Sequence, residues 1–276
     1  MGLEFLLEPL QYAFMQRGMA AVILVGVVSG VVGCYVVVRG MAFFGDALAH
    51  TVLPGVAVAY VAGGNLFIGG LAAGVAAAVG IGWLTREARL KEDTAIGVVF
   101  AGMFALGIAI ISTTRSYSVD LTHILFGDVL GVADADLLIM LVFGALVIGT
   151  VAALYKEFLV MSFDPGLAKT LRLPTEPLRL LLLGLLAVTI VASLQTVGIA
   201  LMVAMLVTPA ATARLLVKRL HHMMVVSALV GAVSGVVGLY LSFYLNIPSG
   251  PAIVLTTTAL FIVVFVAVQA RRRRGQ

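Results

Sequence analysis

Long apolar runs alternate with short polar segments along most of the chain. Four of the runs contain no Asp, Glu, Lys or Arg: Gly18–Val38, Leu66–Thr85, Thr94–Thr114 and Leu137–Tyr155. Each is close to the roughly 20 residues that a helix needs to cross about 30 Å of hydrocarbon. The runs lack the alternating pattern of membrane β-strands, so they predict membrane-spanning helices.

Two further uncharged runs are too long for a single crossing. Leu180–Ala213 has a polar break at Gln195–Thr196, with Gly198 directly after it, which predicts a reversal of the chain there. Met223–Ala270 is divided by Asn246–Pro251, a segment rich in residues that break helices. Both runs are therefore expected to fold back on themselves.

When Met41–Ala62 is added as a span, the pattern predicts about eight to nine crossings, with nine favoured. Composition agrees, because 62% hydrophobic and 11% charged residues leave too little polar surface for a water-soluble domain. We therefore predict an all-α, polytopic integral membrane bundle in which residues 1–276 form one domain. The single cysteine, Cys34, excludes an internal disulfide and a cysteine-based metal cage.

The basic residues predict the orientation of the bundle. With nine spans, every Lys and Arg except Arg17 and Arg115 falls on one side, which the positive-inside rule assigns to the cytoplasm. The C-terminus is then cytoplasmic and the N-terminus lies outside, although one miscounted span would move the N-terminus. Arg271–Arg274 follow the last span, so we expect them to contact anionic lipid headgroups, and no nucleic-acid partner is expected.

An acidic segment is expected on the outer face, between the fourth and fifth spans. Residues 119–136 contain four aspartates and His123 but no Lys or Arg. Such a rim would concentrate cations at the outer mouth, and His123 and Asp128 are candidate metal ligands within it. The alternative is an ordinary solvated loop with a short interfacial helix.

The second span carries three residues that are costly in lipid. Asp46, His50 and Pro54 follow one another at intervals of four, so Asp46 and His50 share one face of a helix. If Arg39 marks the cytoplasmic surface, they lie about 10 and 16 Å into the membrane. A charge at that depth costs at least about 2.5–3.5 kcal/mol. Pro54 has no N–H, so the His50 carbonyl is expected to lose its helical partner and the helix is easy to break.

Carboxylate and imidazole together form a ligand set for Mn²⁺, Zn²⁺ or Fe²⁺ and do not favour Cu⁺. Asp46 and His50 are therefore candidates for metal or proton translocation. The alternative from the residues alone is a structural Asp–His pair that holds two helices together without any ligand.

The segment from Lys156 to Arg179 is the longest polar stretch on the cytoplasmic side. Phe158, Leu159 and Met161 beside Lys156 and Glu157 suggest a short amphipathic helix that could dock a soluble partner; a plain loop is the alternative. The chain has no GxxxxGK[ST] motif, so it cannot be its own P-loop ATPase.

Shared packing motifs link two distant spans. Val25–Tyr35 and Val230–Tyr240 read VGVVSGVVGCY and VGAVSGVVGLY, and both contain glycines at the small-xxx-small spacing of close helix contacts. An inverted repeat is one interpretation; a common packing composition is the other.

Four stretches of the chain resemble the membrane subunit of metal-cation ABC importers, the type that takes up zinc, manganese or iron(II). The most specific is RGMAFFGDALAHTVLPGVAVAY at Arg39–Tyr60. DLTHILFGDVLGV, YKEFLVMSFDPGLAKTLRLP and VGIALMVAMLVTPAATARLL, starting at Asp120, Tyr155 and Val197, resemble the outer segment, the coupling loop and a late pore-lining helix of that family.

The resemblance implies a homodimeric permease in the bacterial plasma membrane, with two cytoplasmic ATPase subunits and an extracytoplasmic metal-binding protein as partners. It implies no permanent cofactor, and Mn²⁺ or Zn²⁺ (or else Fe²⁺) as the ion transported. Asp46 and His50 fall where the family places its pathway ligands, and the surroundings of His123 are closer to the manganese type. The coupling loop, residues 156–176, would dock the ATPase through Lys156, Glu157, Phe158, Ser162, Phe163, Asp164 and Pro165.

A self-sufficient metal channel or proton-coupled carrier using the same residues is the competing hypothesis. An intramembrane metalloenzyme has no support, because His50 is the one histidine predicted inside a span and no HExxH motif is present.

Overall fold

The computed structural model describes residues 7–88, 90–113 and 129–274. Within these residues, nine helices are long and apolar enough to cross a membrane, which confirms the favoured count. The helices with spanning segments are α2 (Ala13–Val38), α3 with α4 (Ala42–Thr51 and Leu53–Val61), α5 (Leu66–Glu87), α6 (Glu92–Ser112), α8 (Asp134–Ala153), α11 (Thr175–Leu216), α12 (Leu220–Leu245) and α13 (Ser249–Arg274). The short elements are η1 (Pro9–Gln11), η2 (Val129–Gly131), α9 (Tyr155–Phe163) and α10 (Pro165–Thr170).

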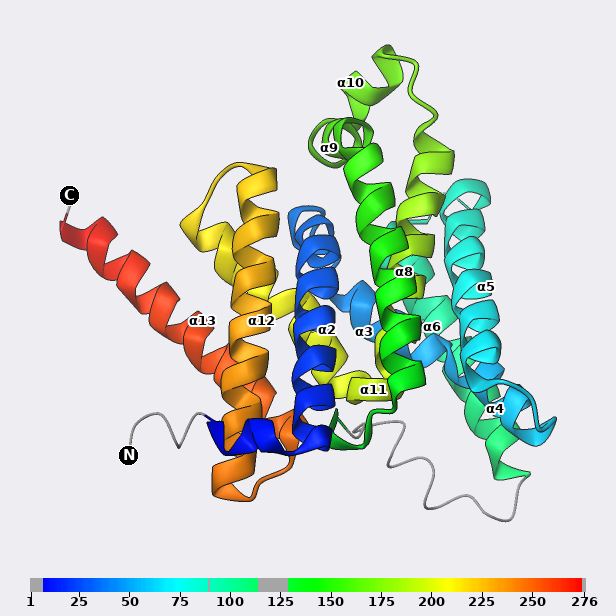
Figure 1. Cartoon of the computed structure of the whole chain (residues 1–276). Helices are drawn as coiled ribbons and strands as arrows, with labels where there is room; N and C mark the ends of the chain where they lie inside the picture. The colour runs from blue at the N-terminus through cyan, green and yellow to red at the C-terminus, as the bar shows by residue number, and fades with distance from the viewer. Residues whose placement is uncertain (1–6, 89, 114–128, 275–276) are drawn as a thin grey trace.

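Helix α11 contains two spans joined by a sharp turn. Gly198 has φ 73° and ψ 170°, a backbone conformation that residues with a side chain rarely adopt. The two spans are Thr175–Leu194 and Thr196–Leu216, and Gly198 lies at the start of the second. In Figure 1, α11 descends from α10, turns at the opposite side of the bundle and rises again. The reversal predicted next to Gln195–Thr196 is therefore confirmed.

The reversal of the chain predicted at Asn246–Pro251 is also present. α12 ends at Leu245, Asn246 adopts the left-handed conformation with φ 53°, and α13 starts at Ser249. The Ser242 hydroxyl donates to the carbonyl of Ile247 at 2.7 Å, which stabilises the turn.

The two faces of the bundle carry different elements. In Figure 1, α9 and α10 project from the upper face, on the side where α2, α5 and α8 end. η1 and the start of α2 lie at the lower face (Figure 1). Nine crossings place the two chain ends on opposite faces, as the distribution of basic residues predicted. We refer to the face with α9 and α10 as the inner face.

Helices α2 and α12 form the most extensive helix pair, and their repeated motifs meet at the contact. A Cβ at Gly26 would stand 2.7 Å from backbone atoms of Gly231 and Ala232, and one at Gly231 would stand 2.8 Å from the Gly26 carbonyl oxygen. The helices run in opposite directions (Figure 1). The glycines of the two motifs therefore serve close backbone packing.

Other helices leave apolar side chains uncovered. α6 and α13 have only 17% of their most apolar windows buried within the chain, against 67–72% for α2 and for the two halves of α11. In water such surfaces would be unstable, so α6 and α13 face lipid or another subunit.

The outer acidic segment is only partly described. His123 and Asp128 lie outside the described residues. Asp136 accepts a hydrogen bond from the Ala133 N–H at 3.1 Å and so caps α8, and Asp134 lies 3.8 Å from Arg17. These two aspartates have local structural partners.

Candidate metal site

The second span is broken in the middle, next to the polar residues that marked it. α3 ends at Thr51 and α4 begins at Leu53, with Pro54 in its first turn. The proline has no N–H to donate to the His50 carbonyl. That carbonyl therefore lacks its usual helical partner, as predicted, and the Val52 N–H at the end of α3 turns toward it. Asp46 and His50 both belong to the short helix α3, which lies at mid-height of the bundle in Figure 1.

Asp46 and His50 lie side by side in the predicted i, i+4 arrangement. The His50 Nδ1 atom lies 2.9 Å from the Asp46 main-chain oxygen and 3.7 Å from Asp46 Oδ1. A carbonyl oxygen can only accept, so Nδ1 carries the proton and donates it. His50 Nε2 then keeps its lone pair, which is the form of imidazole that binds metals. The geometry therefore provides one nitrogen and the neighbouring carboxylate oxygens as ligands.

Two phenylalanines from α6 hold the His50 ring. The ring centroids of Phe100 and Phe104 lie 5.7 and 5.5 Å from that of His50, both nearly edge-on. The two phenylalanines stack on each other at 5.8 Å. Edge-to-face contacts of this kind stabilise one ring orientation, so α6 fixes the direction of the imidazole. Sequence reasoning missed this pair, because phenylalanine is common in any membrane span.

One chain offers only part of a coordination sphere. Among the described residues, no group of three or more His, Cys, Asp or Glu side chains is close enough to hold a metal ion. The side chains of Asp46 and His50 are 41% and 20% exposed, so both remain accessible at the surface of a single chain. A complete site needs further ligands from water, from another subunit or from main-chain oxygens.

The segment between α8 and α11 forms two short helices, α9 and α10, and the first of them lies where the apolar spacing predicted a helix. The Asp164 carboxylate caps α10 by accepting a hydrogen bond from the Leu167 N–H at 2.9 Å, and Pro165 occupies the first turn. Lys156, Phe163, Asp164 and Pro165 are exposed, whereas Glu157 and Ser162 are half-buried.

Phe158 requires a correction. It is fully buried and makes an edge-on contact with Tyr35 of α2, with ring centroids 5.7 Å apart. It cannot touch a soluble partner from there. The apolar side of α9 anchors the helix to the membrane bundle, so Phe158 is a packing residue and not a docking residue.

The sequence profile of the ABC 3 transport family matches residues 11–268. The chain belongs to this family. Among its ABC 3 relatives, the manganese transport system membrane protein MntC of Listeria monocytogenes is 49% identical over 261 residues, which cover 95% of this chain and 93% of the relative. The manganese import system permease protein ScaB of Streptococcus gordonii is 42% identical, with 95% and 94% covered.

A solved structure shows the same fold. The structure described as PsaBC from Streptococcus pneumoniae in complex with Fab superposes with a TM-score of 0.85 at 40% identity, covering 96% of this chain and 95% of that one. The helical arrangement described above is thus that of an ABC 3 permease, and this chain is a multi-pass membrane protein of that class.

Proposed function

We propose that this permease imports Mn²⁺ across the bacterial cell membrane as the membrane-spanning subunit of an ABC transporter. The observation that carries the proposal is the Asp46–His50 pair on the broken second span, with Nε2 of His50 free to bind a metal. Manganese is favoured as the cargo because relatives that are 49% and 42% identical to this chain are named as manganese transporters. Zn²⁺ and Fe²⁺ suit the same ligands.

Two copies of the chain would complete the site. One copy brings one carboxylate and one imidazole, and these side chains remain partly exposed. A two-fold axis next to α3 would bring a second Asp46 and His50 to the same ion, giving two nitrogen ligands and two carboxylates. Such a set is strong enough to hold Mn²⁺ during transfer, while the ion can still leave because each side of the pathway opens in turn.

Energy would come from separate ATPase subunits on the inner face, and an extracytoplasmic metal-binding protein would deliver the ion. The absence of a P-loop motif from the sequence supports a separate ATPase. The exposed parts of α9 and α10 would form the surface for it, and both helices precede α11 directly in the chain (Figure 1).

Reconstitution tests the proposed function directly. The permease is purified with its ATPase subunits and placed in liposomes, with the metal-binding protein on the outside. ⁵⁴Mn²⁺ should accumulate only when ATP is supplied on the ATPase side, and excess Mn²⁺ should compete better than Zn²⁺ or Fe²⁺. Accumulation by the permease alone without ATP would instead establish a self-sufficient channel or carrier.

A substitution at Phe163 is expected to weaken docking of the ATPase. Its side chain is 58% exposed at the end of α9, and it is the large apolar group among the exposed docking candidates. Phe163→Ala should lower the amount of ATPase that co-purifies by about tenfold, since exposed aromatic anchors often dominate an interface. The melting temperature of the permease alone should not change.

Phe265→Ala is the matched control, because Phe265 is 43% exposed on α13, away from α9 and α10. If the wild-type chain and the Phe163→Ala variant recover equal amounts of ATPase, Phe163 does not contribute to the docking surface.

A further inference from the structure

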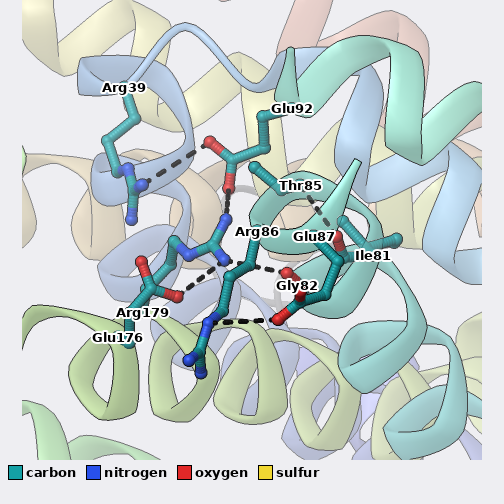
Figure 2. A network of polar contacts seen from close by, with 9 residues as sticks. All are labelled: Arg39, Ile81, Gly82, Thr85, Arg86, Glu87, Glu92, Glu176 and Arg179. Carbon is teal, nitrogen blue, oxygen red and sulfur yellow. Dashed lines mark hydrogen bonds and ion pairs between the residues drawn. The ribbon is translucent and has the colours of Figure 1, made fainter. Parts of the chain in front are cut away.

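Four charged side chains from α2, α6 and α11 meet at the inner ends of these three helices (Figure 2). Glu92, at the start of α6, lies between two arginines: its Oε2 is 3.6 Å from Arg39 Nη2 and its Oε1 is 3.9 Å from Arg179 Nη1. Nη2 of Arg179 also donates to Glu176 Oε2 at 2.9 Å and to the Gly82 carbonyl of α5 at 3.1 Å. We call Arg39, Glu92, Glu176 and Arg179 the inner charge cluster.

The inner charge cluster is largely removed from water. The side chains of Arg39, Glu92 and Arg179 are 14%, 23% and 11% exposed. Burial lowers the pKa of the Arg39 guanidinium below its ordinary value, while the Glu92 carboxylate opposes that shift. Two buried cations close together would repel each other strongly, so the Glu92 carboxylate is needed to hold Arg39 and Arg179 in place.

The cluster connects the two functional regions of the chain. Arg39 ends α2 and stands three residues before α3, the helix that carries Asp46 and His50. Glu92 begins α6, which further along contacts the His50 ring through Phe100 and Phe104. Arg179 lies near the start of α11, which follows the docking helices α9 and α10. Glu92 thus links the start of α11 to both helices that shape the metal site.

The pairing in the cluster is incomplete in this conformation. Both distances from Glu92 to an arginine exceed the roughly 2.7–2.9 Å of a charge-assisted hydrogen bond. Arg39 Nη1, Arg179 Nε and Glu92 Oε1 are buried without a hydrogen-bond partner. Such groups gain stability from a rearrangement that pairs them fully. Shorter contacts from Glu92 to Arg39 and Arg179 would therefore stabilise a conformation in which the inner ends of α6 and α11 lie closer together.

We propose that Glu92 is a positioning residue that couples movement of the docking helices to the metal site, an inference that rests on the proposed function. Displacement of α9 and α10 by the ATPase shifts Arg179 with the start of α11. The shift changes the pairing of Glu92 with Arg179 and Arg39 and so moves α6 and α3 together. Without the carboxylate, ATP hydrolysis continues but is no longer converted efficiently into ion movement.

The test compares Glu92→Gln with the wild-type chain in the full complex with ATPase and metal-binding protein, reconstituted in liposomes. The readout is the number of ATP molecules hydrolysed per ⁵⁴Mn²⁺ ion imported. Glu92→Gln should raise this ratio about tenfold, within the usual range of coupling between two sites. Glu87→Gln is the matched control, because Glu87 pairs with Arg86 at the exposed inner surface (Figure 2) and should leave the ratio unchanged.

A second variant separates coupling from a stability effect. Arg179→Gln should raise the ratio as Glu92→Gln does, and the double variant should be no worse than either single one, because both changes break the same link. If Glu92→Gln fails to assemble, the ratio is measured on Glu92→Asp, which keeps the charge on a shorter side chain and should raise the ratio less.

Three results would overturn the role of Glu92. These are a wild-type ratio in Glu92→Gln, fully additive effects in the double variant, or a wild-type ratio in an assembled Glu92→Asp when Glu92→Gln does not assemble. Failure of the proposed function looks different, since the wild-type complex itself would then import no ⁵⁴Mn²⁺.

Discussion

Replacing His50 with Ala, or Asp46 with Asn, is expected to abolish ATP-dependent Mn²⁺ uptake. Each change removes a ligand from the proposed site, where the described residues of one chain bring together no group of three or more His, Cys, Asp or Glu side chains. His50→Ala removes the Nε2 lone pair, and Asp46→Asn removes the negative charge that offsets the charge of the ion. Uptake of ⁵⁴Mn²⁺ by the reconstituted complex should fall to the level measured without ATP.

Assembly should survive both substitutions, because Asp46 and His50 are partly exposed and their contact with each other lies within one helix. The yield of complex and its ATPase activity in detergent check this point. His221→Ala is the matched control, since His221 is an exposed histidine at the start of α12 and should have no effect. Wild-type uptake in either site variant would show that the metal takes another path.

The second large effect is expected at Gly26, where α2 and α12 touch. A side chain there would meet backbone atoms of Gly231 and Ala232 at 2.7 Å, and a backbone cannot rotate out of the way. Gly26→Val should therefore separate the two helices and destabilise the fold by about 1–3 kcal/mol or more. The melting temperature of the purified permease, followed by thermal unfolding in detergent, should fall by several degrees.

Gly149→Val controls for the added side chain itself. Gly149 lies on α8, and a Cβ at this position has no neighbour within 4 Å. Its melting temperature should equal that of the wild-type chain. A Gly26→Val variant as stable as Gly149→Val would mean that α2 and α12 are not in backbone contact.

Much of the fold could be predicted because lipid imposes a simple rule on sequence. A membrane-spanning helix needs an uncharged run of about 20 residues. The positions of the uncharged runs therefore predicted the positions of the helices. The breaks near Gly198 and at Asn246–Pro251 could be predicted because glycine and proline interrupt a helix through their own backbone properties. Glycine can adopt a positive φ, and proline has no N–H for the helical hydrogen bond. The Asp46–His50 pair could be found because polar groups in an apolar span are rare and i, i+4 spacing is fixed by the helix.

Contacts between distant segments could not be predicted in the same way. Arg39, Glu92 and Arg179 each look like an ordinary charge at the end of a span, and only the fold brings them together. Phe158 was assigned to the docking surface because an amphipathic pattern shows that one side is apolar but does not say what it covers. In the fold it covers Tyr35.

The central claim is that His50 holds the transported ion, and pulsed electron paramagnetic resonance of Mn²⁺ bound to the complex tests it most directly. Mn²⁺ is paramagnetic, so a bound imidazole is detected through the coupling of its ¹⁴N nucleus to the ion. The wild-type complex should show this coupling, and the His50→Ala complex should lose it. Bound Mn²⁺ without ¹⁴N coupling in the wild type, or with the same coupling in His50→Ala, would contradict the account.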